Sequence, residues 1–248
     1  MIPPQPLGKL VAVASGKGGV GKTWFAITLA HALARAGRNI LLFDADLGLA
    51  NIDIQLGLTP ARDVASLLAG RSAWAETVIH HDGGFDILPG RSGSGSLAAL
   101  EESILEQLLA LLQTQAPHYD HILLDLGAGL DRTQRRLAAA TDTLLVIVTE
   151  EPTALTDAYA VIKLHQQDSP RHDVRVVVNQ ASGKQNGERT FTTLARACAH
   201  FLKQTPALAG IVRRDDRVRD AIRRQTLLLT RHPASPAATD VESLAAHV

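Results

Sequence analysis

A glycine-rich loop near the start of the chain could bind phosphate. Residues 16–23 read Gly-Lys-Gly-Gly-Val-Gly-Lys-Thr and fit the pattern G-x-x-x-x-G-K-T. Glycines let backbone N–H groups curl around phosphate oxygens without Cβ clashes. Lys22 would bring positive charge to the outer phosphates, and the Thr23 hydroxyl would face Mg²⁺. The pattern therefore predicts a nucleoside triphosphate site built from Gly16, Lys17, Gly18, Gly19, Val20, Gly21, Lys22 and Thr23.

Carboxylates follow two of the apolar runs. Asp44 and Asp46 come after the run 39–43, and Asp125 comes after the run 121–124. Ligands of open parallel sheets sit outside the carboxyl ends of the strands. Carboxylates there suit Mg²⁺, either directly or through bound water. A lone aspartate after a strand would usually cap a turn, but the nearby glycine-rich loop favours a metal site of Thr23, Asp44, Asp46 and Asp125.

The elements that must position these residues alternate along the chain. Helices are predicted over 22–35, 97–112, 153–165 and 192–202, and strands over 10–14, 39–43, 85–88, 121–124, 143–148, 174–178 and 208–212. Most of the strands are continuously apolar, which is typical of parallel strands covered on both faces. The pattern predicts an α/β fold with a doubly wound, mostly parallel sheet flanked by helices.

Length and composition suit one large domain. The chain has 248 residues, of which 46% are hydrophobic and 20% charged. We predict a single domain over 1–248 in which residues 1–9, with three prolines, form a flexible N-terminal extension. The polar stretch 182–189 is predicted to be a mobile loop.

Charge and cysteine content limit the surroundings of the protein. The formal net charge is zero, which gives no strong signal for nucleic acid. The one cysteine, Cys198, cannot form an intrachain disulfide, and it lies in a predicted helix where a core role is expected. No apolar run approaches the roughly 20 residues that a bilayer requires. These features predict a cytoplasmic protein.

A second lysine, Lys17, directly follows the first glycine of the loop. The stretch 17–23 resembles the deviant Walker A signature of the MinD/ParA ATPases. The resemblance implies that Lys17 reaches the nucleotide of a partner subunit, so that ATP holds a homodimer together and hydrolysis separates it. Lys17 could instead only add charge beside its own phosphates.

The same resemblance assigns roles in catalysis. It places Asp44 and Asp46 in switch I, with Asp46 orienting the attacking water, and it gives Asp125 a water-mediated contact with Mg²⁺. It places Gly127 and Gly129 in switch II, which senses the γ-phosphate. The chain would thus be a Mg²⁺-dependent ATPase whose catalytic residues are Lys17, Lys22 and Asp46, without a covalent intermediate.

Recognition of the base is less completely matched. The resemblance implies that Asn179 hydrogen-bonds the adenine of ATP or ADP, and that the segment from Arg213 to Asp215 lines its other side. Arg213 stands where many relatives have proline, and Asn179 could instead cap a turn. Trp24 follows Thr23, where a small or polar residue is common, and would either pack under the sheet or contact the nucleotide.

Three further stretches, 44–53, 151–159 and 231–238, resemble the FlhG (FleN) branch, which controls the number and placement of flagella. That implies a protein partner in flagellar or polar machinery. Residues 239–248 contain no Lys or Arg and match a membrane-binding helix poorly. Membrane contact is therefore expected to be weak or indirect, at the inner face of the cell membrane.

Two other functions stay open at this point. The basic stretch 213–224 is compatible with a ParA-like ATPase that partitions DNA. A scaffold that binds nucleotide without significant hydrolysis is the other alternative, although Lys17, Lys22, Asp46 and Asp125 are all present.

Overall fold

A computed structural model describes residues 8–90, 102–129, 131–170 and 173–248. Within these ranges the strands form one eight-stranded sheet in the order β3-β4-β2-β5-β1-β6-β7-β8. All neighbouring strands run parallel except β3, which pairs antiparallel with β4. The strands are β1 (Lys9–Ala14), β2 (Ile40–Ala45), β3 (Ile79–His81), β4 (Phe85–Leu88), β5 (His121–Leu126), β6 (Thr143–Val148), β7 (Asp173–Ala181) and β8 (Ala207–Arg213).

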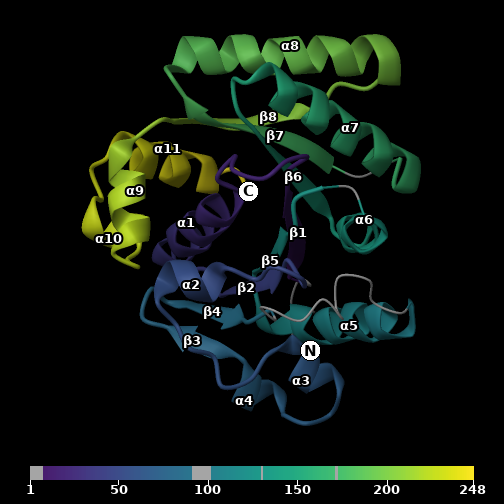
Figure 1. The fold of residues 1–248 in the computed structure, drawn as a ribbon, viewed down its shortest axis with the longest axis vertical. Coiled ribbons are helices and arrows are strands. Elements are labelled where there is room, and N and C mark those ends of the chain that lie inside the picture. The colour runs from purple at the N-terminus through teal and green to yellow at the C-terminus, as the bar shows by residue number, and fades with distance from the viewer. Residues whose placement is uncertain (1–7, 91–101, 130, 171–172) are drawn as a thin grey trace, which may run out of the picture.

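Helices cover both faces of the sheet. One face carries α1 and α11, with α9 and α10 beside them, and the other face carries α5 to α8 (Figure 1). This arrangement confirms the predicted doubly wound α/β fold. The helices are α1 (Lys22–Arg35), α2 (Ile52–Leu56), α3 (Val64–Leu68), α4 (Trp74–Thr77), α5 (Glu102–Gln115), α6 (Arg132–Ala139), α7 (Pro152–Asp168), α8 (Lys184–Leu202), α9 (Asp216–Arg223), α10 (Leu228–Arg231) and α11 (Pro236–Ala245), and a 3₁₀ turn spans Ala116–His118.

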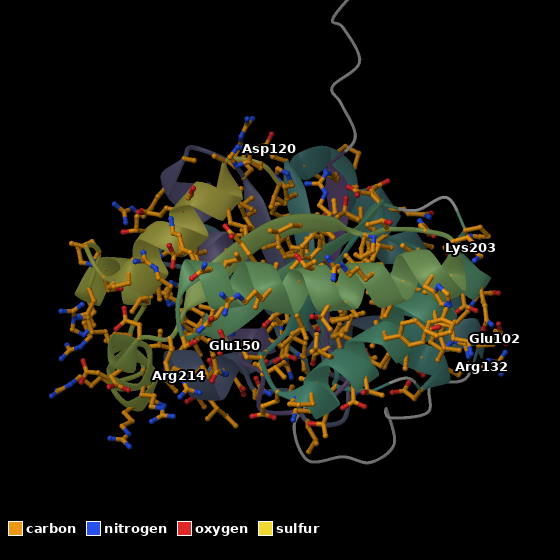
Figure 2. The ribbon with its side chains drawn as sticks, turned by 90° about the horizontal axis from the view of Figure 1, so that it is seen from above. Glu102, Asp120, Arg132, Glu150, Lys203 and Arg214 are labelled. Atoms are coloured by element: carbon orange, nitrogen blue, oxygen red, sulfur yellow. The ribbon has the colours of Figure 1, made fainter. Side chains whose placement is uncertain are left out.

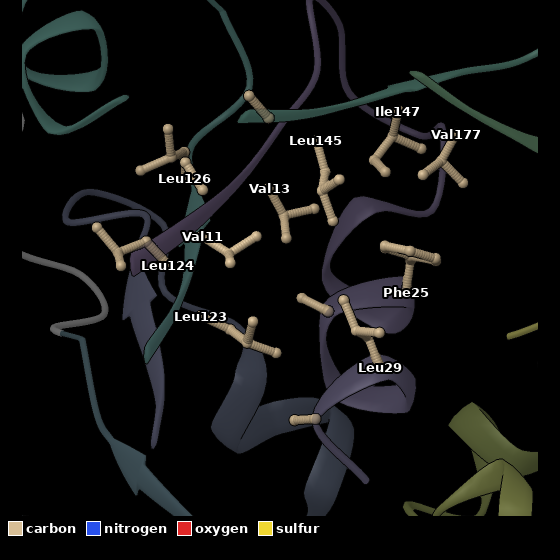
Figure 3. Packing of buried hydrophobic residues seen from close by; sticks show 14 of the residues in the cluster. Val11, Val13, Phe25, Leu29, Leu123, Leu124, Leu126, Leu145, Ile147 and Val177 are labelled. Carbon is tan, nitrogen blue, oxygen red and sulfur yellow. The ribbon is translucent and has the colours of Figure 1, made fainter. Parts of the chain in front are cut away.

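The core lies between the central strands and α1. Figure 3 shows Phe25 and Leu29 of α1 facing the side chains of Val13 and Leu145 on the sheet. All four side chains are fully buried. Because β1 and its neighbours are covered on both sides, almost every residue along them is apolar, which explains their continuous apolar runs.

Two sequence-based expectations were wrong. Strand β3 was not predicted, because three residues at a sheet edge carry almost no periodic signal. The stretch 182–189 was expected to be a mobile loop, but α8 begins at Lys184. Gly187 packs so closely against Ile211 of β8 that a Cβ on it would lie 2.5 Å from that side chain. Tertiary packing therefore fixes a segment whose composition is polar.

Residues 8 and 9 do not belong to a flexible extension, contrary to the prediction for residues 1–9. Lys9 is the first residue of β1, and the Gly8 N–H donates to the Ala116 carbonyl at 3.1 Å. Residues 1–7 lie outside the described ranges, as do residues 97–101 of the helix predicted over 97–112, which the structure has as α5.

The last helix is part of the cover of the sheet. Val241 and Leu244 of α11 are buried, and α11 contacts both β8 and α1. The apolar face of residues 239–245 is therefore used in packing. Among the described residues, no helix combines the length and the apolar character that a membrane crossing requires.

Cys198 is a core residue, as predicted. Its side chain is fully buried in α8, and burial raises the pKa of the thiol to about 11. A thiol with so high a pKa carries little nucleophilic thiolate at neutral pH.

Candidate nucleotide-binding site

The glycine-rich loop joins β1 to α1, in the context that its sequence predicted. Gly19 and Gly21 have φ of 82° and 84°, in the left-handed region that favours glycine. Two side chains of β7 hold the loop from behind. The Asn179 amide donates to the Val20 carbonyl at 2.7 Å, and the Gln180 amide donates to the Gly19 carbonyl at 3.3 Å. The loop is thus anchored to the sheet while its other face lines an open pocket.

A buried ion pair lies at the base of this pocket. The Lys22 ammonium donates to Asp125 Oδ1 at 2.7 Å, and the two side chains are 8% and 0% exposed. Burial raises the pKa of the Asp125 carboxyl, whereas Lys22 and the Thr23 hydroxyl oppose that rise. Each charge compensates the other, so a ligand that draws Lys22 away must also bring a positive charge to Asp125.

Asp44 lies beside Asp125, because β2 and β5 pair in that register. Its Oδ2 accepts from the N–H groups of Asn51 and Ile52, both at 2.9 Å, and so anchors the start of α2. Burial, and next the neighbouring Asp125, raise the pKa of Asp44 to about 7. The free energy of holding both carboxylates ionised is therefore high unless a cation joins them.

These carboxylates fit a magnesium ion. Asp44 Oδ1 and Asp125 Oδ2 are buried, and neither has a hydrogen-bond partner within the described part of the chain. Buried polar atoms are normally paired, and unpaired carboxylate oxygens are the hard donors that Mg²⁺ prefers. Thr23 brings a hydroxyl to the same place.

Of the predicted switch residues, Asp46 and Gly127 lie next to each other. A Cβ on Gly127 would be 3.1 Å from Asp46 Oδ1, so the missing side chain makes room for that carboxylate. The Gly127 N–H donates to Gln134 Oε1 at 2.9 Å, and the Gly129 N–H donates to the Ser15 carbonyl at 3.1 Å. Asp46 also lines the pocket beside the glycine-rich loop, which we call the phosphate pocket. Catalysis of hydrolysis in this pocket would require that position.

Lys17 lines the same pocket, but its ammonium group is held from α7. It bonds to the Glu151 carboxylate, and it donates to Thr153 Oγ1 at 3.1 Å. The hydrogen bond from Lys17 to Glu151 lowers the pKa of the Glu151 carboxyl. Because Lys17 and Glu151 are 30% and 65% exposed, water screens the pair, which can break at small cost.

The predicted base-binding residues meet in a second, adjoining cleft. Its wall is formed by Trp24, Asn179, Arg213 and Asp215, and by residues of α9 that include Val218, Arg219 and Ile222. Several of their polar groups are already used within the protein. The Arg213 guanidinium binds the Asp240 carboxylate at 2.8 and 2.9 Å. The Asp215 carboxylate accepts from the Arg217 N–H at 3.0 Å and so caps α9.

Trp24 lies where the two cavities adjoin and lines both of them. The side chain is buried, and its indole N–H lacks a hydrogen-bond partner among the described residues. Of the two roles expected for this residue, packing is seen, because Trp24 belongs to the hydrophobic core, and contact with a nucleotide stays a prediction.

Sequence reasoning missed several residues of the site. Glu151 and Thr153 stood in a stretch that resembled FlhG, but nothing indicated that they would hold Lys17. Val218 and Ile222 belong to the basic stretch 213–224, whose apolar members turn toward the cleft. Gln134 gave no signal at all, because its contact with Gly127 depends on where α6 lies.

The fold and this site define a class of protein. Residues 11–228 match the family model described as the CobQ/CobB/MinD/ParA nucleotide binding domain. The chain belongs to this family of P-loop nucleotide-binding proteins.

Within the family, the chain is similar to regulators of flagella. It is 35% identical over 240 residues to the antiactivator FleN of Pseudomonas aeruginosa, covering 97% of this chain and 86% of that protein. It is 32% identical over 193 residues to the flagellum site-determining protein YlxH of Helicobacter pylori, covering 75% of this chain and 63% of that protein. Both the family and the FlhG (FleN) resemblance are confirmed.

Solved structures agree on the fold. The septum site-determining protein MinD of Pyrococcus horikoshii, solved with Mg-ADP, superposes with a TM-score of 0.80 over 96% of this chain and 95% of that chain, at 20% sequence identity. At that identity the likeness supports the fold rather than particular contacts.

Proposed function

We propose that this protein is a Mg²⁺-dependent ATPase that forms a homodimer with ATP and regulates the number or placement of flagella. The observation that carries the ATPase assignment is the buried group of Lys22, Asp125 and Asp44 beneath the glycine-rich loop. It combines one buried positive charge with two carboxylate oxygens that have no hydrogen-bond partner in the described part of the chain. The triphosphate would supply negative charge to Lys22, and magnesium would supply positive charge to Asp44 and Asp125.

Hydrolysis follows from positioning. On binding ATP, Lys22 exchanges Asp125 for the outer phosphates. Thr23, Asp44 and Asp125 would hold Mg²⁺ directly or through water, which supplies positive charge to the phosphate oxygens. Asp46, which faces the pocket from beside Gly127, orients the attacking water.

Dimerisation rests on Lys17. In this structure Lys17 is bound within its own subunit by Glu151 and Thr153. To reach the nucleotide of a second copy it must leave that exposed contact, which costs little. Leu49 and Ile54, which are 74% and 61% exposed near the same pocket, offer apolar surface to a second copy.

Titration with ATP and Mg²⁺ in a calorimeter tests the first half of the proposal, and absence of heat at saturating ligand would refute it. Size measurement with ADP and then with ATP tests the second half. It is best done in Asp46→Ala, where slow hydrolysis should preserve the dimer. Asp46→Ala combined with Lys17→Ala is the control and should stay monomeric. A monomer in both variants would leave an ATPase without the dimer switch.

The cellular role is proposed from the similarity to FleN and YlxH. We expect a cytoplasmic protein that acts through a protein of the flagellar or polar machinery, with any membrane contact supplied by that partner. Deletion of its gene should change the number or position of flagella, and the Lys17→Ala variant should fail to restore them. Normal flagella after deletion would exclude this role.

One observation favours a second candidate, a DNA-partitioning ATPase. Arg214, Arg217, Arg219 and Arg223 are exposed, and none forms an ion pair with the described residues. Figure 2 shows Arg214 on the same side of the molecule as Glu150, which precedes α7. Retention of DNA that requires ATP and weakens with added salt would support this candidate over the flagellar role.

A further inference from the structure

Helices α9 and α2 both line the pocket beside the glycine-rich loop, through Ile222 and Gln55, and the side chain of Gln225, which lines neither this pocket nor the base cleft, joins them. Gln225 lies just beyond the end of α9. Its amide donates to the Ile54 carbonyl of α2 at 2.9 Å, across 171 positions of sequence. Figure 1 shows α9 and α2 as neighbours.

The backbone on both sides of this contact ends a helix in the left-handed conformation. Gln225 has a φ of 51°, in the left-handed region that residues with a Cβ rarely occupy. Gly57, at the end of α2, has a φ of 68°, and a Cβ on it would lie 2.9 Å from Gln225 Oε1. The glutamine side chain thus uses the room that glycine leaves. Each of the two residues ends a helix in the left-handed conformation that commonly closes helices, so the contact joins the two helix ends.

The contact completes the support of α2. Asp44 anchors the first turn of the helix through the N–H groups of Asn51 and Ile52. Gln225 anchors the last turn through the Ile54 carbonyl. Gln55 of the same helix lines the phosphate pocket, together with Asp46 just upstream.

On the other side, α9 forms part of the wall of the base cleft. Val218, Arg219 and Ile222 line that cleft, and Ile222 also lines the phosphate pocket. The residues that line this cleft and the residue that holds α2 thus belong to one helix and the turn that follows it.

We propose that Gln225 is a positioning residue that ties α2 to α9, so that occupation of the base cleft sets the place of Asp46. The proposal rests on the ATPase function proposed above. Gln225 acts through α2 and makes no contact with the nucleotide.

The variant Gln225→Met tests the hydrogen bond by itself. Methionine has nearly the same length and meets the same backbone requirement, but it cannot donate. The expected result is a kcat lower by about threefold to tenfold, in the range of measured couplings between sites. The KM for ATP and the melting temperature should stay close to those of the wild type, and Gln225→Asn should recover part of the kcat.

A matched pair of glycine variants separates positioning from stability. Lys203, at the end of α8, also has a left-handed φ, of 57°. Lys203→Gly and Gln225→Gly both relieve the backbone at an exposed turn, so their melting temperatures should shift alike. Only Gln225→Gly should lower the kcat. An unchanged kcat in Gln225→Gly would show that the contact is merely structural. The same conclusion would follow if kcat fell only together with a melting temperature lower than that of Lys203→Gly.

Hydrogen exchange of the α2 amides distinguishes failure of the Gln225 proposal from failure of the ATPase proposal. In the wild type, ATP with Mg²⁺ should protect the amides of α2 and of the glycine-rich loop. In Gln225→Met the protection of the loop should remain and that of α2 should fall. A wild type that ignores ATP would refute the ATPase proposal, whereas equal protection of α2 in both proteins would overturn the role of Gln225.

Discussion

The two walls of the nucleotide site differ in what their polar groups are bound to. At the wall formed by the glycine-rich loop and the ends of β2 and β5, Lys22 and Asp125 are paired. One carboxylate oxygen each of Asp44 and Asp125 nevertheless has no hydrogen-bond partner among the described residues. We call this the phosphate wall, and the cleft lined by Trp24, Arg213 and Asp215 the base wall. At the base wall, Arg213 and Asp215 are committed to Asp240 and to the cap of α9. The phosphate wall is thus built to take up charge, while the base wall mostly holds protein segments together.

This contrast indicates where specificity and energy should arise. Unpaired buried charge is costly, so ligands that complete the phosphate wall should bind tightly. The base wall offers fewer unused donors, among them the indole N–H of Trp24. Substitutions at the first wall should therefore change ligand binding and turnover, and most substitutions at the second should change stability.

The largest effect is expected from Lys22→Ala. Loss of the ammonium removes the charge for the phosphates and leaves Asp125 buried without a counter-charge, which costs about 3–5 kcal/mol of stability. ATP binding, measured by calorimetry, should fall by at least about 100-fold, in line with loss of a charged contact of some 3 kcal/mol. The double variant Lys22→Ala with Asp125→Asn should regain stability but not ATP binding. Near-normal ATPase activity in Lys22→Ala would contradict the site.

Asp46→Ala should separate binding from turnover. In the proposed mechanism the carboxylate orients the attacking water and does not hold the phosphates, so ATP affinity should change little. The kcat should fall by roughly 100-fold, as is usual when a proton-handling group is lost. Phosphate release in single-turnover conditions measures this, and unchanged release would show that Asp46 does not act on the water.

Arg213→Ala should lower the stability of the fold more than it lowers the affinity for ATP. It leaves the nearly buried Asp240 carboxylate without its bidentate partner and loosens α11 from β8. The melting temperature should fall by several degrees, while ATP affinity stays within about twofold, a change of 0.4 kcal/mol or less. A large loss of affinity at unchanged stability would mean that the guanidinium leaves Asp240 for the nucleotide.

Trp24 should be the exception at the base wall. In Trp74→Phe it is the one remaining tryptophan, since the chain has two. Its fluorescence should then change on addition of ATP with Mg²⁺. Trp24→Phe, which keeps an aromatic ring of smaller size and removes the N–H, should weaken ATP binding by about fivefold, the value of one hydrogen bond. No spectral change at saturating nucleotide would place Trp24 outside the site.

The smallest effect is expected from Glu151→Gln. Lys17 then loses its charged partner but keeps Thr153, so it is released more easily. The ATP-dependent dimer should form at a slightly lower protein concentration, as analytical ultracentrifugation can measure. Glu150→Gln is the control, because Glu150 bonds Ser182 instead of Lys17. Weaker dimerisation in Glu151→Gln would show that Glu151 supports the dimer rather than the free subunit.

How far the sequence predicts this molecule depends on how local each feature is. The glycine-rich loop and the carboxylates after β2 and β5 depend on a few neighbouring residues, so type and spacing were sufficient. The contacts of Lys17 with Glu151 and of Arg213 with Asp240 join segments far apart in the chain. No local pattern announces such pairs. The start of α8 was missed for the same reason, because its polar residues are held by packing against β8.

The absence of a side chain at Gly127 has a mechanical consequence. The carboxylate of Asp46 and the amide of Gln134 occupy the space where a side chain on this residue would lie. A methyl group added in Gly127→Ala should therefore press on the Gln134 amide first and on Asp46 next, and so displace two side chains from one small substitution.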